Sequence, residues 1–528
     1  ALDNHGIPFF CDSLVQCGKL FDKSLDTGRL PLMCSPLMRP YKKGSTIPRL
    51  FRGLLLRVFE CSGVLLSDPD VRAIEFLRQL YGLAKKLDIP CPNERNYESV
   101  RSFVETDESI RAGTTEWDLS DSSSCSLRDL HFRDHDLLDL SALPLFRDFV
   151  PVECGSAETP SISEQRCDWD TLQRVSDIAS AFLGRFNPSE WRSKHGPGAV
   201  SERLSPSISK YEGVVWSDRL ESVFPYADFA HANYAAWVDA IQHESASKEF
   251  PFSEGASRLL CVPKTYKGPR LIAAEPIAHQ WCQQIIRDYL VTQLQGKHPL
   301  RRSINFHDQT YSGSLAVEAS RSLSHATIDL SEASDRISPW VIERLVRANP
   351  TLLAALKACR TRWIRQDIDW KQPRFMKLRK FSTMGSAVTF PMQTLLFTVV
   401  AVSSVLTERK LKPTIANVRR ISGQVRVFGD DIIVPIDSWT RCTGTLEALG
   451  LKVNWSKTFG DGRFRESCGL DAYNGTLVPR VNINRVPSLT SPESVLSAVD
   501  SHNNLYLRGL WNTASYIRKT VESLGKIG

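Results

Sequence analysis

The stretch VRVFGDDIIVP, residues 425–435, places two neighbouring carboxylates, Asp430 and Asp431, inside a strongly apolar, β-branched run. Residues 425–428 predict one strand and residues 432–434 predict a second. Glycine and aspartate between them are typical of a tight turn, because Gly accepts a positive φ and Asp bonds to its own backbone. The stretch therefore predicts a hairpin with buried flanks and two acids at its tip.

Two interpretations of this hairpin differ in what surrounds the acids. The first is an ordinary solvated turn without chemistry. The apolar flanks favour the second, since they hold both carboxylates near a core, where unpaired charge is unfavourable unless a cation neutralises it. The second interpretation needs another carboxylate elsewhere in the chain that shares the cation.

Composition bounds the class of protein. The 528 residues can bury a large core and form several lobes, with 42% hydrophobic and 24% charged residues. A net charge of +7 permits a polyanionic partner. The 13 cysteines show no CxxC pair and predict free thiols in a reducing compartment. The most apolar run, residues 395–406, is too short to span a bilayer and predicts a buried helix.

Much of the positive charge gathers between residues 359 and 381, which carry a net charge of +6. The cations are Arg360, Arg362, Arg365, Lys371, Arg374, Lys377, Arg379 and Lys380, interleaved with Trp363, Trp370, Phe375 and Phe381. Basic side chains among aromatic rings suit phosphate contacts and base stacking. An ordinary solvated face is the alternative.

Three further stretches carry candidate site residues. Residues 259–274 predict two strands joined by a basic turn, whose Lys264, Lys267 and Arg270 can neutralise a triphosphate. In residues 324–338, a short strand ends at Asp329, and Ser331 is the expected cap of a helix that carries Asp335.

The third stretch is FSTMGSAVTFPMQTLLF, residues 381–397. Its small residues, 382–387, predict a loop that lets a ligand approach the backbone closely. A helix is expected over residues 389–406, with Pro391 tolerated in its first turn. His131 and His135, beside Asp134 and Asp136, favour a solvated acidic stretch over a second metal site.

Asp329 and Asp430, on separate strands, can together bind two Mg²⁺ ions about 3.5–4 Å apart. Magnesium prefers oxygen ligands and shares its shell with water and phosphates. One ion would activate a 3′-hydroxyl and the other would stabilise a leaving pyrophosphate. A metal pair therefore explains why two acids lie in an apolar hairpin.

In this order, the motifs VPKTYKGPRLIAAEP, DQTYSGSLA, ATIDLSEASDRIS, FSTMGSAVTF, VFGDDIIVP, NWSKTF and FRESCG resemble a viral RNA-dependent RNA polymerase. More narrowly, they are similar to the replicase subunit of the leviviruses, the small positive-strand RNA bacteriophages. The motifs cover residues 259–469.

The resemblance implies an α+β right-hand fold of fingers, palm and thumb, with an antiparallel palm sheet flanked by helices. The implied fingers comprise the N-terminal region and fingers at 1–257, fingers with the basic hairpin at 258–323, and a basic insertion at 351–381. The implied palm comprises 324–350, with the first metal aspartate, and 382–470, with the glycine loop, the Gly-Asp-Asp hairpin and FRESCG. Residues 471–528 are the implied short thumb and C-terminal region.

The resemblance also implies a role for each site residue. Asp329, Asp430 and Asp431 are the expected ligands of two Mg²⁺ ions, with Mn²⁺ as a substitute, and Lys457 is expected to protonate the pyrophosphate. Lys264, Lys267 and Arg270 would hold the triphosphate, and Asp335, Ser382, Gly385 and Thr389 would recognise the ribose. Arg360, Arg362, Arg365, Lys377, Arg379, Lys380 and Arg465 would contact RNA. Ser386 departs from the family, which commonly has Asn there.

The implied function is synthesis of RNA from ribonucleoside triphosphates on a single-stranded RNA template, in the cytoplasm of a bacterial host. Implied partners are template and product RNA, host elongation factors Tu and Ts and a ribosomal protein, without a membrane. A non-catalytic RNA-binding scaffold is the alternative, but it would have lost a metal acid. A reverse transcriptase would lack Asp335, and a capsid-associated protein would not need the acids.

Overall fold

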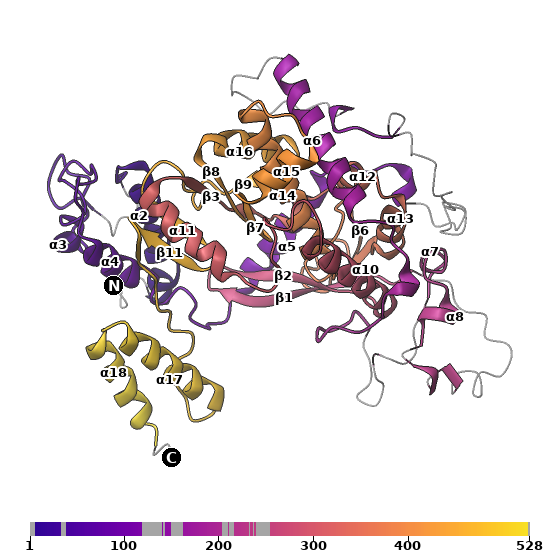
Figure 1. Ribbon diagram of the computed structural model, residues 1–528. Coiled ribbons are helices and arrows are strands. Elements are labelled where there is room, and N and C mark those ends of the chain that lie inside the picture. The colour runs from indigo at the N-terminus through magenta and orange to yellow at the C-terminus, as the bar shows by residue number, and fades with distance from the viewer. Residues whose placement is uncertain are drawn as a thin grey trace.

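The structure is a computed structural model that describes residues 6–32, 39–118, 140, 143–148, 162–202, 210, 216–231, 233–235, 237–238 and 254–525 (Figure 1). His131 and His135 lie outside the described residues. Within these ranges, helices surround four small sheets, ordered β2-β1-β5-β6, β10-β11-β12, β3-β8-β7 and β4-β9. The predicted α+β class with antiparallel sheets is confirmed, and one parallel pair, β1 with β5, adds to it.

The central sheet consists of β3 (His325–Ile328), β8 (Asp431–Pro435) and β7 (Arg426–Phe428). Both neighbouring pairs are antiparallel, and Ile328 lies opposite Ile432. Apolar β-branched residues fill these strands, and almost all are buried. The strands predicted around the Gly-Asp-Asp turn are confirmed.

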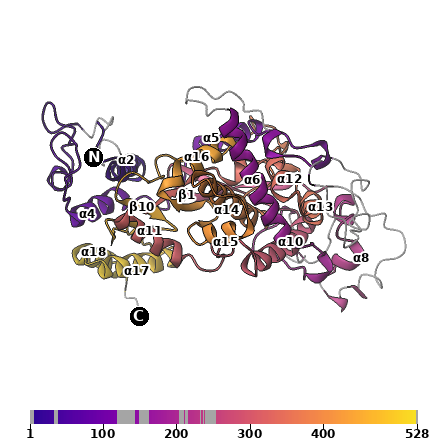
Figure 2. The same ribbon diagram turned by 45° about the horizontal axis from the view of Figure 1, so that its top comes forward.

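Helix α14 (Thr389–Glu408) runs through the middle of the molecule (Figures 1 and 2). It packs on β8 and is covered by α6 (Ile162–Phe182), α15 (Ile415–Ser422) and α16 (Trp439–Ala448). The predicted helix, with Pro391 in its first turn, is confirmed. Among the described helices it alone is long and apolar enough to cross a bilayer, but it is a buried core helix.

The helix predicted to start at Ser331 begins later. β4 (Leu330–Ser331) pairs with β9 (Lys452–Val453), so Ser331 is not a helix cap. A 3₁₀ turn follows, and α12 (Pro339–Val346) starts at a proline, with the Ser338 hydroxyl accepting from the Val341 N–H. Strand pairing wins over the local helix signal, and proline at the first helical position sets the true start.

The hairpin sheet contains both basic stretches of the sequence. The predicted hairpin, β1 (Ser257–Thr265) and β2 (Gly268–Ala274), is confirmed. β5 (Trp363–Arg365) and β6 (Phe375–Lys377) extend it, and α5 (Asn93–Glu108) packs against one face through Val100 and Phe103. The part of the main body that the structure describes also contains α7 (Asp218–Glu221), α8 (Tyr226–Phe229), α10 (Ile277–Gln295), α11 (Thr310–Ser322) and α13 (Pro350–Cys359).

Residues 6–32 and 39–90, the N-terminal module, pack against a segment more than 350 residues later. The module holds a π-helical turn (Phe9–Ser13), α2 (Leu14–Thr27), α3 (Arg52–Leu55) and α4 (Val71–Gly82). It shares one apolar core with Phe459, Phe464, Tyr473 and Val478, on and beside β10 (Phe464–Ser467), β11 (Leu470–Tyr473) and β12 (Thr476–Leu477). The domain boundaries predicted from the sequence stay predictions.

A separate helical hairpin, α17 (Pro492–Leu507) and α18 (Trp511–Glu522), projects from the main body below the N-terminal module (yellow in Figure 1). It has a small core of its own, which includes Leu505 and Ile517.

A buried ion network secures the N-terminal module. The Arg78 guanidinium, 1% exposed, lies 2.7 Å from the Asp22 carboxylate and 2.8 Å from that of Asp471. It also lies over the Phe464 ring and donates to the Val478 carbonyl. One arginine on α4 therefore joins α2 to the β10–β11 hairpin.

Arg78→Ala should lower the free energy of unfolding by about 3 kcal/mol, because it leaves two buried carboxylates without their main partner. Arg72→Ala, at an exposed position of the same helix, should change it by less than about 0.5 kcal/mol. Denaturant titration of both variants measures the difference. Equal stability of the two would contradict the structural role of the network.

Candidate active site

The register of the central sheet brings the predicted acids together. Ile328 pairs with Ile432, so Asp329, the next residue, lies beside the Asp430–Asp431 tip. Burial and the Asp430 charge raise the pKa of Asp329, and burial followed by Asp430 raises the pKa of Asp431 to about 7. Three carboxylates therefore share a partly desolvated space, in which a cation would relieve their repulsion.

The tip of the hairpin is held by α14. Gly429 has φ 62°, and an added Cβ would lie 2.8 Å from the Phe390 ring. Its N–H donates to the Thr394 hydroxyl (3.1 Å), and the Phe390 and Phe428 rings lie 5.1 Å apart. A side chain at Gly429 would strain the backbone and displace the Phe390 ring, which explains glycine before the acids.

Asp329 is anchored by the segment that follows β9. The Asn454 side-chain amide donates to one carboxylate oxygen (2.7 Å), and the Lys457 ammonium lies 3.6 Å from the other. Lys457 also lies 3.9 Å from Glu466 on β10. Although burial alone would lower it, the Glu466 and Asp329 charges raise the pKa of Lys457, so this side chain stays a cation beside the acids.

The FRESCG segment forms the β10–β11 hairpin, whose Cys468–Gly469 turn faces the acids. The backbone N–H of Cys468 donates to the Asp431 carboxylate. Asp431 is therefore held by a motif 37 positions further along the chain.

One of the three predicted triphosphate cations, Lys264, approaches the acids across the site, and Arg270 lies close to Lys264. Arg270 lies opposite Val262 on the hairpin, on the face away from α5. Burial, then Arg270 and Lys457, lower the pKa of Lys264, while the Asp430 and Asp329 charges raise it. Lys264 is thus within electrostatic reach of both acids. Lys267 lies in the turn at the end of the hairpin.

The predicted ribose-recognition loop is tied to the hairpin sheet. The Thr389 hydroxyl donates to the Ser382 hydroxyl (2.8 Å). Gly385 has φ 152°, and an added Cβ would lie only 1.8 Å from the Ala273 carbonyl oxygen. The Ala273 N–H donates to the Met384 carbonyl (2.8 Å), so the loop lies directly on β2.

Buried polar side chains also hold the loop of residues 382–387 in place. The Glu275 carboxyl accepts from the Thr383 hydroxyl (3.0 Å) and from the Gln283 amide (3.0 Å), and Gln283 accepts from the Ala387 N–H (3.2 Å). Asp335 lies nearby on its 3₁₀ turn and accepts from Lys380 (3.1 Å).

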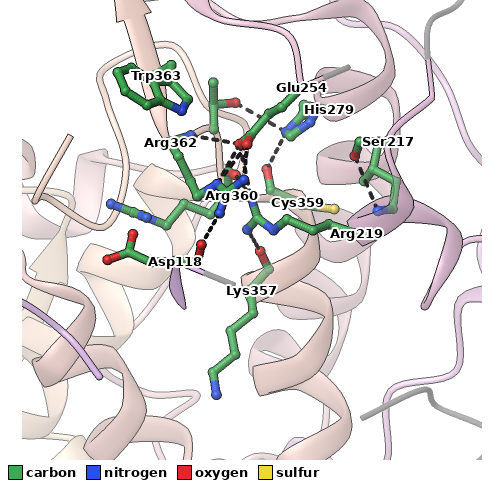
Figure 3. Close-up of polar contacts among 12 residues, drawn as sticks. Asp118, Ser217, Arg219, Glu254, His279, Lys357, Cys359, Arg360, Arg362 and Trp363 are labelled. Carbon is green, nitrogen blue, oxygen red and sulfur yellow. Dashed lines mark hydrogen bonds and ion pairs between the residues drawn. The ribbon is translucent and has the colours of Figure 1, made fainter. Parts of the chain in front are cut away.

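The structure contradicts the RNA-binding role predicted for Arg360 and Arg362. Both are buried in an ion cluster with Arg219 and Glu254 (Figure 3). Arg362 Nε lies 2.7 Å from Glu254, and Arg360 donates to the Leu378 carbonyl (2.6 Å). These guanidinium groups satisfy internal acceptors and do not reach the surface.

Lys380 and Arg465 need the same correction. Lys380 is fully buried, pairs with Asp335 and lies 3.5 Å above the Phe103 ring. Arg465 is also fully buried, and it donates to the His325 carbonyl (2.7 Å) and lies 3.6 Å from Asp26 on α2. Arg465 joins the central sheet to the N-terminal module and does not contact RNA.

The other predicted RNA contacts remain accessible on the β5–β6 face. Lys377 and Arg379 are exposed, and Arg365 is partly exposed. Trp370 and Phe375 are 81% and 52% exposed on the same hairpin. The exposed part of the basic stretch therefore still combines cations with aromatic rings.

Comparison with known proteins assigns the family. Residues 226–504 match the family model of the RNA replicase beta-chain, and this match covers more than half of the chain. The chain belongs to this family.

Curated relatives agree with this family. The chain is 31% identical to the RNA-directed RNA polymerase beta chain of Enterobacteria phage fr over 42% of its own length and 36% of the relative. The chain is also 31% identical to the RNA-directed RNA polymerase subunit beta of Qbeta virus strain MX1, over 51% of this chain and 42% of the relative. Its identity to the RNA-directed RNA polymerase beta chain of Escherichia phage MS2 is 31% as well, over 46% of this chain and 40% of the relative. The matches thus span about two fifths of each relative.

Among solved structures, the RNA-dependent RNA polymerase of a human picorbirnavirus matches 52% of this chain and 56% of its own, with 14% identity and a TM-score of 0.34. A TM-score of this size is too low to establish a shared fold.

Two cations near the site were not predicted from the sequence of this replicase family member. Lys19 on α2 and Lys85 after α4 both interact electrostatically with Lys457 and Glu466. No motif marks either residue, because their place at the site depends on how the N-terminal module docks. The i, i+4 spacing of Lys19 and Lys23 on one helix face was the only available signal.

The donor set of the acids suits magnesium. All three side chains offer carboxylate oxygens, and Asp431 is desolvated beside another acid. Among the described residues, no group of three or more His, Cys, Asp or Glu side chains lies in an arrangement that could by itself hold a metal ion. An open carboxylate set fits an ion that keeps water and substrate phosphates in its shell.

Gly385→Ala should destabilise the protein by about 1–3 kcal/mol, because the new methyl group collides with the Ala273 backbone at a φ unfavourable for alanine. Gly444→Ala in α16 meets no atom within 4 Å and should stabilise by up to about 1 kcal/mol. Thermal unfolding of both variants tests this, and a neutral Gly385→Ala would show that the loop is not fixed to β2.

Proposed function

We propose that this chain synthesises RNA from ribonucleoside triphosphates on a single-stranded RNA template, by two-metal nucleotidyl transfer. The observation that carries the proposal is the pairing of Ile328 with Ile432, which sets Asp329 beside Asp430 and Asp431 and opposite the basic hairpin. The relatives that match the chain are named RNA-directed RNA polymerases. The resulting activity would replicate the genome of a positive-strand RNA phage.

Asp329, Asp430 and Asp431 would hold two Mg²⁺ ions, or Mn²⁺ in their place. When bound, these ions lower the pKa of the attacking 3′-hydroxyl and neutralise charge on the leaving pyrophosphate. Lys264, Lys267 and Arg270 would orient the triphosphate. Lys457 remains protonated beside Asp329 and is positioned to give a proton to the pyrophosphate.

The ribose would be recognised by Asp335, Ser382 and Thr389, with Gly385 allowing the loop to lie against β2. The hydroxyl pair of Ser382 and Thr389 offers donors and acceptors to a 2′-hydroxyl. Lys380 orients the Asp335 carboxylate from a buried position. This role replaces the RNA contact first expected of Lys380.

In the right-hand arrangement we assign the hairpin sheet to the fingers, the central sheet with β10–β11 to the palm, and α17–α18 to the thumb. Arg365, Lys377 and Arg379 would then contact the RNA strand on the exposed fingers face. Exposed Trp370 and Phe375 suit stacking on unpaired bases.

The relatives' names describe beta chains, which supports an assembly with further subunits. Host elongation factors Tu and Ts and a ribosomal protein, in the cytoplasm of a bacterial cell, remain the proposed partners and location. The alternative, a non-catalytic RNA-binding scaffold, does not require the three acids to meet, whereas the sheet register brings them together.

Asp430→Asn should abolish nucleotide incorporation and leave RNA binding nearly unchanged, because it removes a metal ligand and not a strand contact. Asp461→Asn changes an exposed acid between Phe459 and β10 and serves as the control. The measurement is incorporation by the purified chain on single-stranded RNA with Mg²⁺, alone and with bacterial extract. Full activity of Asp430→Asn would refute the metal assignment.

Asp335→Ala should reduce the preference for ribonucleotides over deoxyribonucleotides by about 10-fold, the value of one lost hydrogen bond of about 1.4 kcal/mol. The kcat/KM ratio for the two substrates measures this preference. Glu318→Ala, an exposed acid on α11, is the control. An unchanged ratio in Asp335→Ala would reject its role in ribose recognition.

A further inference from the structure

Two lysines of the N-terminal module lie partly buried, and their ammonium groups form no ion pair. The side chain of neither Lys19 nor Lys85 forms a hydrogen bond or ion pair with any residue in the described ranges. Lys23, one turn from Lys19 on α2, bonds both Asp26 and the Thr458 carbonyl, each at 2.8 Å. A partly buried ammonium without a protein acceptor is unfavourable, and an anion bound beside it would relieve that cost.

The docking of α2 directs Lys19 toward the site. Lys23 reaches the Thr458 carbonyl and lies over the Phe459 ring, so this face of α2 lies along residues 457–459. Lys19 lies one turn earlier on the same face, because residues four apart are neighbours on a helix. It therefore approaches Lys457, which itself contacts Asp329.

Lys85 lies on the neighbouring side of the same space. An added Cβ on Gly18 would lie 2.9 Å from the Tyr81 Cβ, so α2 and α4 touch beside Lys19. Lys85 follows Tyr81 by four residues. An added Cβ on Gly82 would lie 2.7 Å from Arg480, which places a further cation next to Lys85.

The turn of the basic β1–β2 hairpin lies on the third side of the space between Lys19 and Lys85. The Tyr266 carbonyl at its turn accepts from Arg95 (3.0 Å) and from the Cys91 thiol (3.7 Å). Arg95 also lies over the Tyr266 ring and pairs with Asp12 (3.3 Å). This clamp fixes the neighbouring Lys267 against the N-terminal module.

The electrostatics agree with this geometry. Burial is the main cause that lowers the pKa of Lys19, and the Lys267 and Lys457 charges lower it further. Burial also lowers the pKa of Lys85, with the Arg480 charge as the second cause, to about 8. The Glu466 charge acts in the opposite direction and raises the pKa of both lysines. Cations from three separate segments thus repel one another, and a ligand with several negative charges would relieve the repulsion.

We propose that Lys19 and Lys85, together with Lys267, bind the diphosphate group of the incoming nucleotide, which becomes the pyrophosphate product. The proposal rests on the proposed function. In nucleotidyl transfer the 3′-oxygen bonds to the α-phosphorus, the α–β phosphoanhydride bond breaks, and pyrophosphate leaves with that electron pair. Negative charge therefore develops on the leaving pyrophosphate. Lys457, its proposed proton donor, lies on the side of the site that Lys19 approaches.

A free diphosphate fits this space better than an RNA strand. The lysines are half-buried between α2, α4 and the hairpin turn. An RNA backbone needs an open, continuous surface, which the exposed β5–β6 face offers. The N-terminal module thereby supplies part of the nucleotide site.

The test compares wild type with Lys19→Met and Lys85→Met, which keep the aliphatic stem and remove the charge. Lys86→Met, at an exposed neighbouring position, is the matched control. Calorimetric titration with magnesium pyrophosphate measures binding without turnover. Each site variant should bind pyrophosphate about 10-fold more weakly, as for one charge-assisted hydrogen bond, while Lys86→Met and Lys85→Arg bind like wild type.

Steady-state incorporation adds a second readout. Lys19→Met and Lys85→Met should raise KM for nucleotide and the inhibition constant for pyrophosphate by similar factors, with RNA affinity unchanged. Unchanged pyrophosphate binding, or a loss of RNA affinity that parallels the rise in KM, would overturn the proposal. Lysine-dependent pyrophosphate binding without any incorporation by wild type would instead count against the proposed polymerase activity.

Discussion

The antiparallel pairing of β3 with β8 is the constraint on which the site depends. Ile328 opposite Ile432 buries apolar residues on both strands, and a one-residue slip would turn these side chains to the wrong face. Hydrophobic burial therefore sets where Asp329 and Asp431 lie, although neither contributes to the core. The favourable free energy of the apolar flanks offsets the repulsion of the carboxylates, which Lys457 and Asn454 relieve only in part, because the pKa of Asp329 is still raised.

The surroundings of this sheet are assembled from distant parts of the chain. β3 bonds to Phe459 on one side, and Phe459 belongs to the core of the N-terminal module. The Arg465–Asp26 and Arg78–Asp471 ion pairs add buried links between the N-terminal module and the β10–β11 hairpin. The module is consequently integral to the site, because its docking surface is the segment that carries Lys457 and Glu466.

Local patterns predicted the elements that carry the acids and the basic hairpin. The apolar, β-branched residues on either side of the Gly-Asp-Asp turn correctly indicated β7 and β8, and the long apolar run indicated α14. The failures come from tertiary contacts. Ser331 has the chemistry of a helix cap, yet pairing with β9 holds it in a strand. Lys19 and Lys85 carry no local signal, since only the packing of α2 and α4 brings them to the site.

The basic segment shows why charge along a sequence is an incomplete guide to a binding surface. Arg360 and Arg362 look identical in pattern to Arg365, but Glu254 and backbone carbonyls surround the first two. Burying a guanidinium requires acceptors for its donors, and these come from residues distant in sequence. The segment therefore divides its cations between two roles. The buried ones fix the sheet in place, and that fixed sheet presents Arg365, Lys377 and the exposed aromatic rings on one accessible face.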